Sequence, residues 1–148
     1  MICTCIGRHP NAKGARSFMT ELLEDMILRL RADTFYIGAE SEFEKMVVSV
    51  LEALKETHPH ISCTVVIPKA PKKELNEQNT VYLKLPKGLD EKHRLSVRNN
   101  WLLAPADFLI CCAPTGDEAF EKALKEAEKN GQQWMNVSGY ICDQRGDA

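Results

Sequence analysis

Four groups of polar residues and glycines in this sequence could do chemistry. Arginine binds phosphate or carboxylate groups through its planar array of N–H donors, and glycine lets a backbone approach such a group closely. A carboxylate can bond ribose hydroxyls, or act as a nucleophile or an acid at an anomeric carbon. These residue types predict a pocket for a small polar ligand. The candidates are Gly7, Arg8 and His9; Gly38, Ala39, Glu40, Ser41, Glu42 and Glu44; Arg98 and Asn99; and Thr115 and Gly116.

The second group lies between an apolar run and a helical pattern. The run over 35–37 indicates a strand, and we expect Gly38 to leave it in a conformation closed to other residues. Ser41 and Glu44 have the spacing of a capping box that starts a helix. Such a loop presents backbone N–H groups and the positive end of a helix dipole at the carboxyl edge of a sheet. The apolar positions of the helix recur at Phe43, Met46, Val47, Val50, Leu51 and Leu54.

Strands and helices alternate along the rest of the chain. Strands are predicted at 2–6, 33–37, 61–67, 107–112 and 133–137, with helices between them at about 15–31, 41–54, 91–103 and 117–130. Residues 69–90 form a long excursion, a candidate lid, with one strand-like island at 80–83. The pattern predicts an α/β fold, a single-domain Rossmann-like three-layer sandwich with a mainly parallel sheet of about five strands. The domain is expected to span 1–140, with a loose polar tail at 141–148.

Composition narrows the functional classes. A formal net charge of −2 disfavours a nucleic-acid partner, and no apolar run reaches the length of a membrane span. The six cysteines include no Cys-x-x-Cys pair, and five of them fall in predicted strands, so they are interpreted as buried thiols. We expect a cytoplasmic protein with no metal, no cofactor and no membrane partner.

The order of the motifs resembles the small single-domain branch of the SLOG superfamily, the Rossmann-like proteins related to the cytokinin-activating LOG enzymes. The residues that carry the resemblance are Gly7-Arg8-His9-Pro10, Gly38 with Phe43-Glu44, Arg98-Asn99-x-Trp101, and the loop around Thr115-Gly116. The chain departs from that branch in having Arg8-His9 for His-Arg, Glu42 where glycine is common and Glu44 for Asp. It also lacks the late Gly-Gly and the LOG motif Pro-Gly-Gly-x-Gly-Thr-x-x-Glu. Asp117 and Glu118 near the late loop would repel phosphate at a helix start.

The resemblance implies a nucleotide-like ligand in the crevice at the carboxyl edge. The leading hypothesis is a sensor or sequestering protein that binds an NAD/ADP-ribose-type or cyclic nucleotide signal without turnover. One alternative is a nucleoside or nucleotide N-glycosidase or deoxyribosyltransferase-like enzyme with Glu44 or Glu42 as its nucleophile. Another is a protein-interaction domain with a decayed site. Superfamily relatives often pair through helices, so a homodimer is a further expectation.

Two of these residues have alternative roles that the sequence leaves open. Glu44 would hold ribose hydroxyls, or would close the capping box with Ser41 and need no ligand. Arg98 would meet an anionic group of the ligand, or would pair with Asp107 or Glu91. Trp101, in the same motif, is expected to be a core anchor rather than a stacking platform.

Overall fold

A computed structural model describes residues 1–8, 14–68, 80–83, 85, 88–113 and 118–141. The elements follow one another as β1 (Ile2–Gly7), α1 (Ala15–Arg29), β2 (Thr34–Gly38), α2 (Glu42–Thr57), β3 (Ser62–Ile67), β4 (Thr80–Tyr82), α3 (Glu91–Leu103), β5 (Phe108–Cys112), α4 (Glu118–Lys129), β6 (Gln133–Asn136) and α5 (Ser138–Ile141). The predicted alternation of strands and helices is confirmed, with boundaries that differ by no more than three residues.

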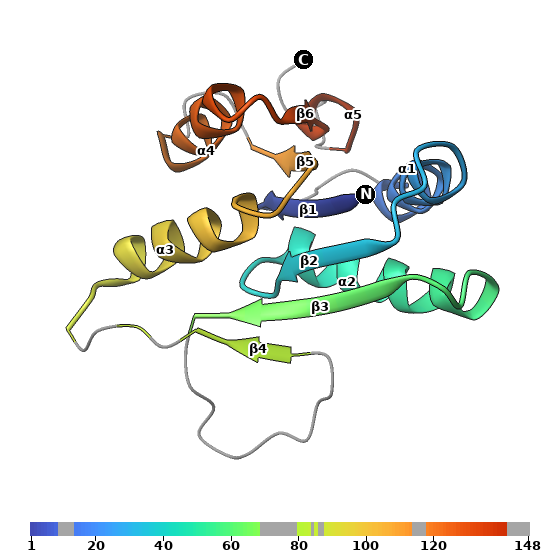
Figure 1. The fold of residues 1–148 in the computed structure, drawn as a ribbon, viewed down its shortest axis with the longest axis horizontal. Helices are drawn as coiled ribbons and strands as arrows, with labels where there is room; N and C mark the ends of the chain where they lie inside the picture. Colours follow the sequence, from blue (N-terminus) through green and yellow to red (C-terminus); the bar gives the residue numbers. More distant parts are fainter. Residues whose placement is uncertain (9–13, 69–79, 84, 86–87, 114–117, 142–148) are drawn as a thin grey trace.

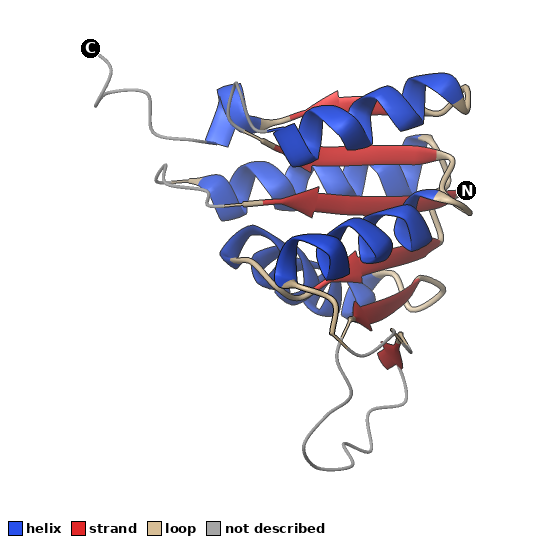
Figure 2. Cartoon of the chain, turned by 90° about the vertical axis from the view of Figure 1, so that its left-hand side faces the viewer, coloured by secondary structure: helices blue, strands red, loops and turns tan. Residues whose placement is uncertain are grey.

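The strands form one sheet in the order β4-β3-β2-β1-β5-β6, and every pair is parallel. Helices lie on both sides of the strands, which makes the Rossmann-like sandwich that the sequence predicts (Figures 1 and 2). The expected count of about five strands is one too low. Residues 80–82 are β4, because they pair with the carboxyl half of β3 at one edge of the sheet. The rest of the candidate lid, 69–79, 84 and 86–87, lies outside the described residues.

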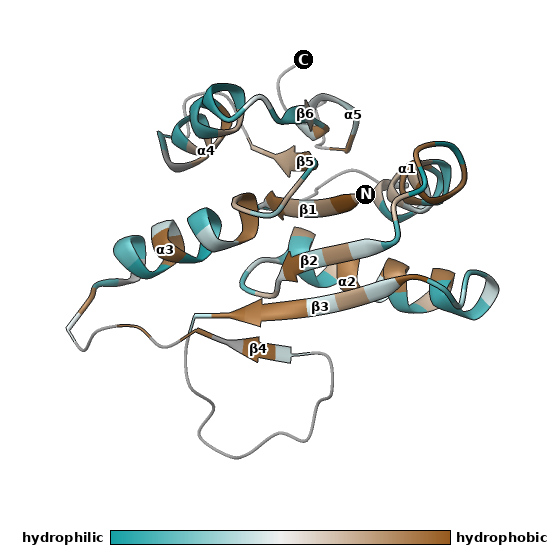
Figure 3. Cartoon of the chain, viewed as in Figure 1, coloured by the Kyte–Doolittle hydropathy of each residue, from teal (hydrophilic) through white to brown (hydrophobic). Residues whose placement is uncertain are grey.

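Each face of the sheet is covered by its own pair of helices. Alternate residues of β1 point to opposite faces, so Cys3 and Cys5 join the core under α1 and α2, whereas Ile6 joins the core under α3 and α4. The central strands are largely hydrophobic in Figure 3, whereas α4 shows mainly hydrophilic residues. Burial on both faces explains why these strands are continuous apolar runs without alternation.

Local signals place the helix ends. Ser41 caps α2 by accepting a hydrogen bond from the Glu44 N–H, and Asp90 caps α3 by accepting one from the His93 N–H. Gly131 follows α4 with φ 73°, and the next N–H reaches back to Ala127 O, which is the expected left-handed end of that helix.

The packed domain reaches one residue beyond the predicted boundary at 140. Residues 138–141 form the short helix α5, and Ile141 is fully buried in the core under α1 and α2. Phe18 of α1 stacks on Tyr140 with ring centroids 5.4 Å apart. Gly139 to Ile141 therefore belong to the packed domain, because an apolar side chain and an aromatic contact hold them there.

Candidate functional site

The strand order reverses at β1, the first strand in sequence, which has β2 on one side and β5 on the other. In open parallel sheets, ligands bind at the carboxyl ends of the strands beside such a reversal. Here that edge is built from the ends of β1 and β2, the first turn of α2 and the middle of α3. The loops at 9–13 and 114–117 also follow strands at this edge but lie outside the described residues.

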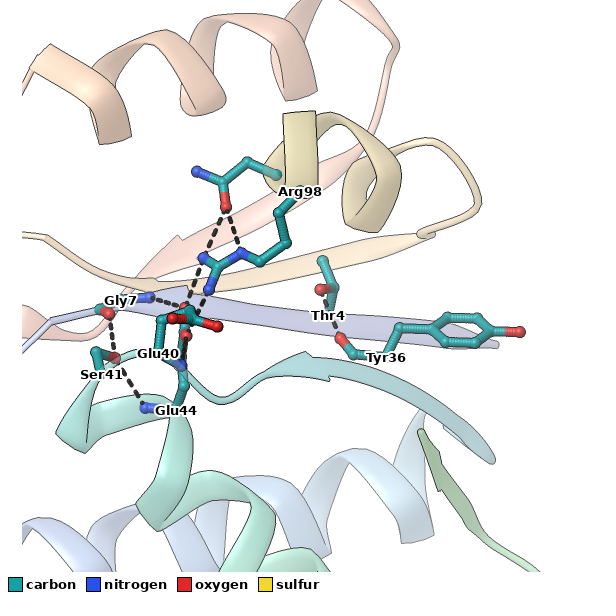
Figure 4. Close-up of polar contacts among 8 residues, drawn as sticks. Thr4, Gly7, Tyr36, Glu40, Ser41, Glu44 and Arg98 are labelled. Carbon is teal, nitrogen blue, oxygen red and sulfur yellow. Dashed lines mark hydrogen bonds and ion pairs between the residues drawn. The ribbon is translucent and has the colours of Figure 1, made fainter. Parts of the chain in front are cut away.

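A buried ion pair joins the two helical layers at this edge (Figure 4). Arg98 Nη1 donates to Glu44 Oε1 and Arg98 Nη2 donates to Glu44 Oε2, both at 2.8 Å. Glu44 belongs to α2 on one face of the sheet, and Arg98 belongs to α3 on the other. Glu44 is only 1% exposed and Arg98 only 2%, so solvent scarcely reaches the pair. Two parallel hydrogen bonds between ionised groups are among the strongest that proteins form.

Two backbone groups complete the shell around the Glu44 carboxylate. The Glu40 N–H donates to Oε1 at 3.0 Å, and the Gly7 N–H donates to Oε2 at 3.4 Å. Each carboxylate oxygen therefore receives one bond from Arg98 and one from the backbone. The pairing register between β1 and β2 ends at Cys5 with Ile37, and beyond it the N–H of Gly7 turns to Glu44 instead of to β2. The carboxylate thus links the ends of both strands to α2.

Ser41 ties the same helix to β1 a second time. Its hydroxyl accepts the Glu44 N–H at 3.1 Å and donates to the carbonyl oxygen of Gly7. The capping interpretation is therefore only half right. The serine half is present, but the Glu44 carboxylate bonds the N–H of Glu40 and not that of Ser41, because it is turned inward to Arg98.

Glycines at both strand ends make room for this arrangement. A Cβ on Gly38 would lie 2.5 Å from Arg98 Nη1 and 2.7 Å from Glu44 Oε1. A Cβ on Gly7 would lie 2.5 Å from the Phe43 ring, which begins the buried face of α2. Gly38 does not have a positive φ. The expected special backbone conformation at Gly38 is therefore wrong, and the residue is needed because the ion pair fills the space of a side chain.

Asn99 fixes the guanidinium from the other side. Its Oδ1 accepts from Arg98 Nε at 3.2 Å and from Nη2 at 2.8 Å, and the side chain is only 7% exposed. The expected alternative partners of Arg98, Asp107 and Glu91, are wrong, because the guanidinium is bonded to Glu44 and Asn99. Asp107 instead accepts the N–H of Ile2 at the opposite edge of the sheet.

The exposed charges of this edge are mixed in sign. Arg8 follows β1, is exposed, and lies with its guanidinium carbon 5.7 Å from the centre of the Phe120 ring. Glu40 and Glu42 are exposed around the first turn of α2, where the helix dipole favours negative charge. Among the described residues, no hydrogen bond engages the N–H of Glu42 or Phe43. An anionic group of a ligand would meet attraction at Arg8 and repulsion at the two glutamates.

The structure brings six of the predicted site residues into one network: Gly7, Glu40, Ser41, Glu44, Arg98 and Asn99. Gly38 lies against it, Ala39 is half-buried beside it, and Arg8 and Glu42 lie exposed at its rim. His9, Thr115 and Gly116 lie outside the described residues. Trp101 is not a buried core anchor, since it is 36% exposed and packs edge-on against Tyr36 at 5.5 Å.

The partnership of Glu44 with Arg98 was missed from the sequence, although a signal for it exists. Glu44 lies three residues before Val47 and seven before Leu51, which places it on the apolar face of α2. Arg98 lies four residues before the buried Leu102 of α3. One charge on the buried face of each of two helices, of opposite sign, predicts a buried pair because an unpaired charge is not tolerated there.

The thiols near the network do not extend it chemically. The hydrogen bond with Cys3 and burial raise the pKa of Cys5 well above its usual value, and burial raises the pKa of Cys63 and of Cys111 to about 12. A protonated thiol is a weak nucleophile and a poor metal ligand. No cluster of three metal-binding side chains occurs among the residues that the structure describes.

No protein-family model matches this chain, and no curated protein matches it. The resemblance to the SLOG superfamily therefore rests on the motifs alone. Within the described ranges, no helix combines the length and the apolar character that crossing a bilayer requires.

Proposed function

We propose that this protein binds a small nucleotide-derived ligand, of the NAD/ADP-ribose type or a cyclic nucleotide, at the carboxyl edge beside β1, and holds it without turnover as a sensor or sequestering protein. The observation that carries the proposal is the buried Glu44–Arg98 pair at the point where the strand order reverses. A buried ion pair is seldom better for stability than apolar residues of the same volume. Its position is better explained by a need to hold backbone and side chains rigidly around a binding site.

The ion pair supports a positioning role rather than direct contact with the ligand. Both Glu44 oxygens already accept two hydrogen bonds each. Arg98 has given four bonds to Glu44 and Asn99, and its charge is neutralised by the carboxylate. In this proposal the anionic part of the ligand lies near Arg8, which follows β1 at the reversal, and the free N–H groups of the first turn of α2 face its uncharged part.

The same geometry favours binding over catalysis. A carboxylate that accepts four hydrogen bonds and a full opposite charge is a weak nucleophile, because its electron pairs are engaged. Glu44 is therefore a poor choice for the nucleophile of an N-glycosidase. Glu42, exposed on the same turn, is the carboxylate that such an enzyme would have to use. Release of free base from nucleosides by the wild type, abolished by Glu42→Gln in a folded protein, would replace the binding proposal with that enzyme.

The direct test is native mass spectrometry of the purified protein, followed by thermal shift with nucleosides, nucleotides, NAD and ADP-ribose. A ligand present at a hundred times its Kd should stabilise the fold by about 2.7 kcal/mol. Arg8→Ala should weaken nucleotide binding, whereas Arg29→Ala should not, because Arg29 lies at the end of α1 near the opposite edge of the sheet. The proposal would be refuted if the wild-type protein carries no co-purified nucleotide-like ligand in the mass spectrum and no compound changes its melting temperature.

A further inference from the structure

The Asn99 side chain has one end bonded and one end unused. Its Oδ1 accepts two hydrogen bonds from Arg98. Its Nδ2 makes no hydrogen bond to any residue in the described part of the chain. The residue is only 7% exposed. Among the described residues, Gln132 Oε1 is the only fully buried side-chain polar atom without a partner, so Asn99 Nδ2 is not sealed from solvent and its N–H groups are open to a ligand.

The orientation of the amide is fixed by chemistry. A guanidinium has only donors, so the atom of Asn99 that faces Arg98 must be the acceptor oxygen. Exchange of the amide oxygen and nitrogen would set donors against donors and lose both bonds. The NH₂ group therefore points away from Arg98 and keeps both of its protons for another partner.

The direction of α3 carries that group toward the candidate site. The helix runs from the carboxyl edge of the sheet, where Glu91 lies, to the opposite edge, where Leu103 leads into β5. Side chains on a helix lean toward its N-terminus, so Asn99 leans toward the carboxyl edge. Arg98, its neighbour, does the same and reaches the end of β2 at Gly38. The unused amide thus lies on the side of α3 where the ligand is proposed to bind.

We infer that the Asn99 Nδ2 group is a specificity-determining donor that binds a neutral acceptor of the ligand, such as a carbonyl oxygen or ring nitrogen of a nucleobase. The inference rests on the proposed function and names the part of the ligand that α3 recognises. A neutral acceptor is favoured because the only charges beside Asn99 in the network, Glu44 and Arg98, cancel each other. A phosphate buried there would lack a compensating positive charge.

Asn99→Asp is the test, with Asn100→Asp as its matched control. Aspartate retains an acceptor for Arg98, so the fold should persist, but it has no N–H donors. Asn100 is the next residue of α3 and is exposed. Binding of adenosine, guanosine, cytidine, uridine and their monophosphates is measured by calorimetry. For the base that binds wild type best, Asn99→Asp should weaken nucleoside and monophosphate binding about ten-fold or more, and Asn100→Asp should leave both within about two-fold of wild type.

The outcomes separate the inference from the proposed function. A wild type that binds none of these compounds, nor ADP-ribose or NAD, overturns both. A wild type that binds monophosphates but no nucleoside, or an Asn99→Asp variant that binds nucleosides as tightly as wild type, overturns the inference alone. Should Asn99→Asp not fold, the side-chain NH₂ signals of Asn99 in a ¹⁵N-labelled wild type decide. They must shift when the best nucleoside is added, and unchanged signals overturn the inference.

Discussion

Replacing Glu44 by glutamine removes one charge of the buried pair with almost no change of shape. Glutamine keeps one acceptor oxygen. Its NH₂ group takes the place of the second carboxylate oxygen, which in the wild type accepts hydrogen bonds from two donors. Those donors are Arg98 Nη2 and the Gly7 N–H, or Arg98 Nη1 and the Glu40 N–H if the amide is turned. Two buried donors lose their acceptor in either orientation, at about 1–3 kcal/mol each. With the uncompensated charge on Arg98, the expected loss of unfolding free energy is about 3–5 kcal/mol.

Urea denaturation followed by circular dichroism measures this loss, with Glu42→Gln as the matched control. Glu42 lies on the same turn but is exposed, so its replacement should change the unfolding free energy by less than about 0.5 kcal/mol. The total unfolding free energy of a domain of this size is about 5–15 kcal/mol, so the Glu44→Gln variant should be much less stable than wild type, or unfolded, at 25 °C.

A double-mutant cycle with Arg98→Met separates the ion pair from general disruption. Once the positive charge is gone, glutamine at position 44 no longer leaves an unpaired guanidinium. The sum of the losses of unfolding free energy in the two single variants should therefore exceed the loss in the double variant by about 2 kcal/mol or more. Additive losses, or a Glu44→Gln variant within about 1 kcal/mol of wild type, would refute the reasoning that this pair holds the carboxyl edge together.

Three further predictions follow from the same structure. Gly38→Ala should lose about 1–3 kcal/mol of unfolding free energy in urea, because its Cβ would overlap the ion pair, whereas Gly139→Ala, with open space around it, should not be destabilised. In the folded protein the pKa of Cys63 and of Cys111 is raised to about 12, whereas in the unfolded chain it is near 9.0. Between pH 9 and pH 12, therefore, these thiols ionise only in the unfolded chain. Stability should therefore fall as pH rises above about 9, by about 1.4 kcal/mol per thiol at pH 10, and Cys111→Ala should reduce the fall seen in urea midpoints; an equal fall in the variant would contradict this. The N-terminal ammonium lowers the pKa of Asp33 below 3.8, so its contribution is present above pH 3.8 and is lost as pH falls further; the gap in melting temperature between wild type and Asp33→Asn should narrow below pH 4, and a constant gap would count against the contact.

The fold could be predicted because its signals are local. Buried parallel strands give continuous apolar runs, and the helices between them show one apolar stripe each. The strand-like island at 80–83 was not counted in the predicted sheet, because β4 has only three residues and its place in the sheet depends on pairing with β3 across the intervening segment. Ile141 was assigned to the loose tail for a similar reason, since it is held by the core beneath α1 and not by its own neighbours in the chain.

The sequence indicates which residues gather at the site, but not how their side chains are bonded to one another. Strand ends of a parallel sheet meet at one edge, so topology alone groups Gly7, Gly38 and Glu44. The pairing of Glu44 with Arg98 was signalled only by two opposite charges on the buried faces of two helices. Its geometry depends on where α3 crosses the opposite face of the sheet, and no local rule gives that position. The capping motif with Ser41 concealed the answer, because the same spacing serves the helix start and leaves the carboxylate free to turn inward.

The ion pair also has a consequence for the order of folding events. Glu44 and Arg98 are 54 positions apart and belong to opposite layers of the sandwich. Neither charge can leave water until both layers have closed over the sheet, because a lone buried charge is too unfavourable. The pair should therefore form after the folding barrier has been crossed, so its replacement should speed unfolding and leave the refolding rate nearly unchanged. The carboxyl edge would be the last part of the molecule to become dry and the first to take up water again.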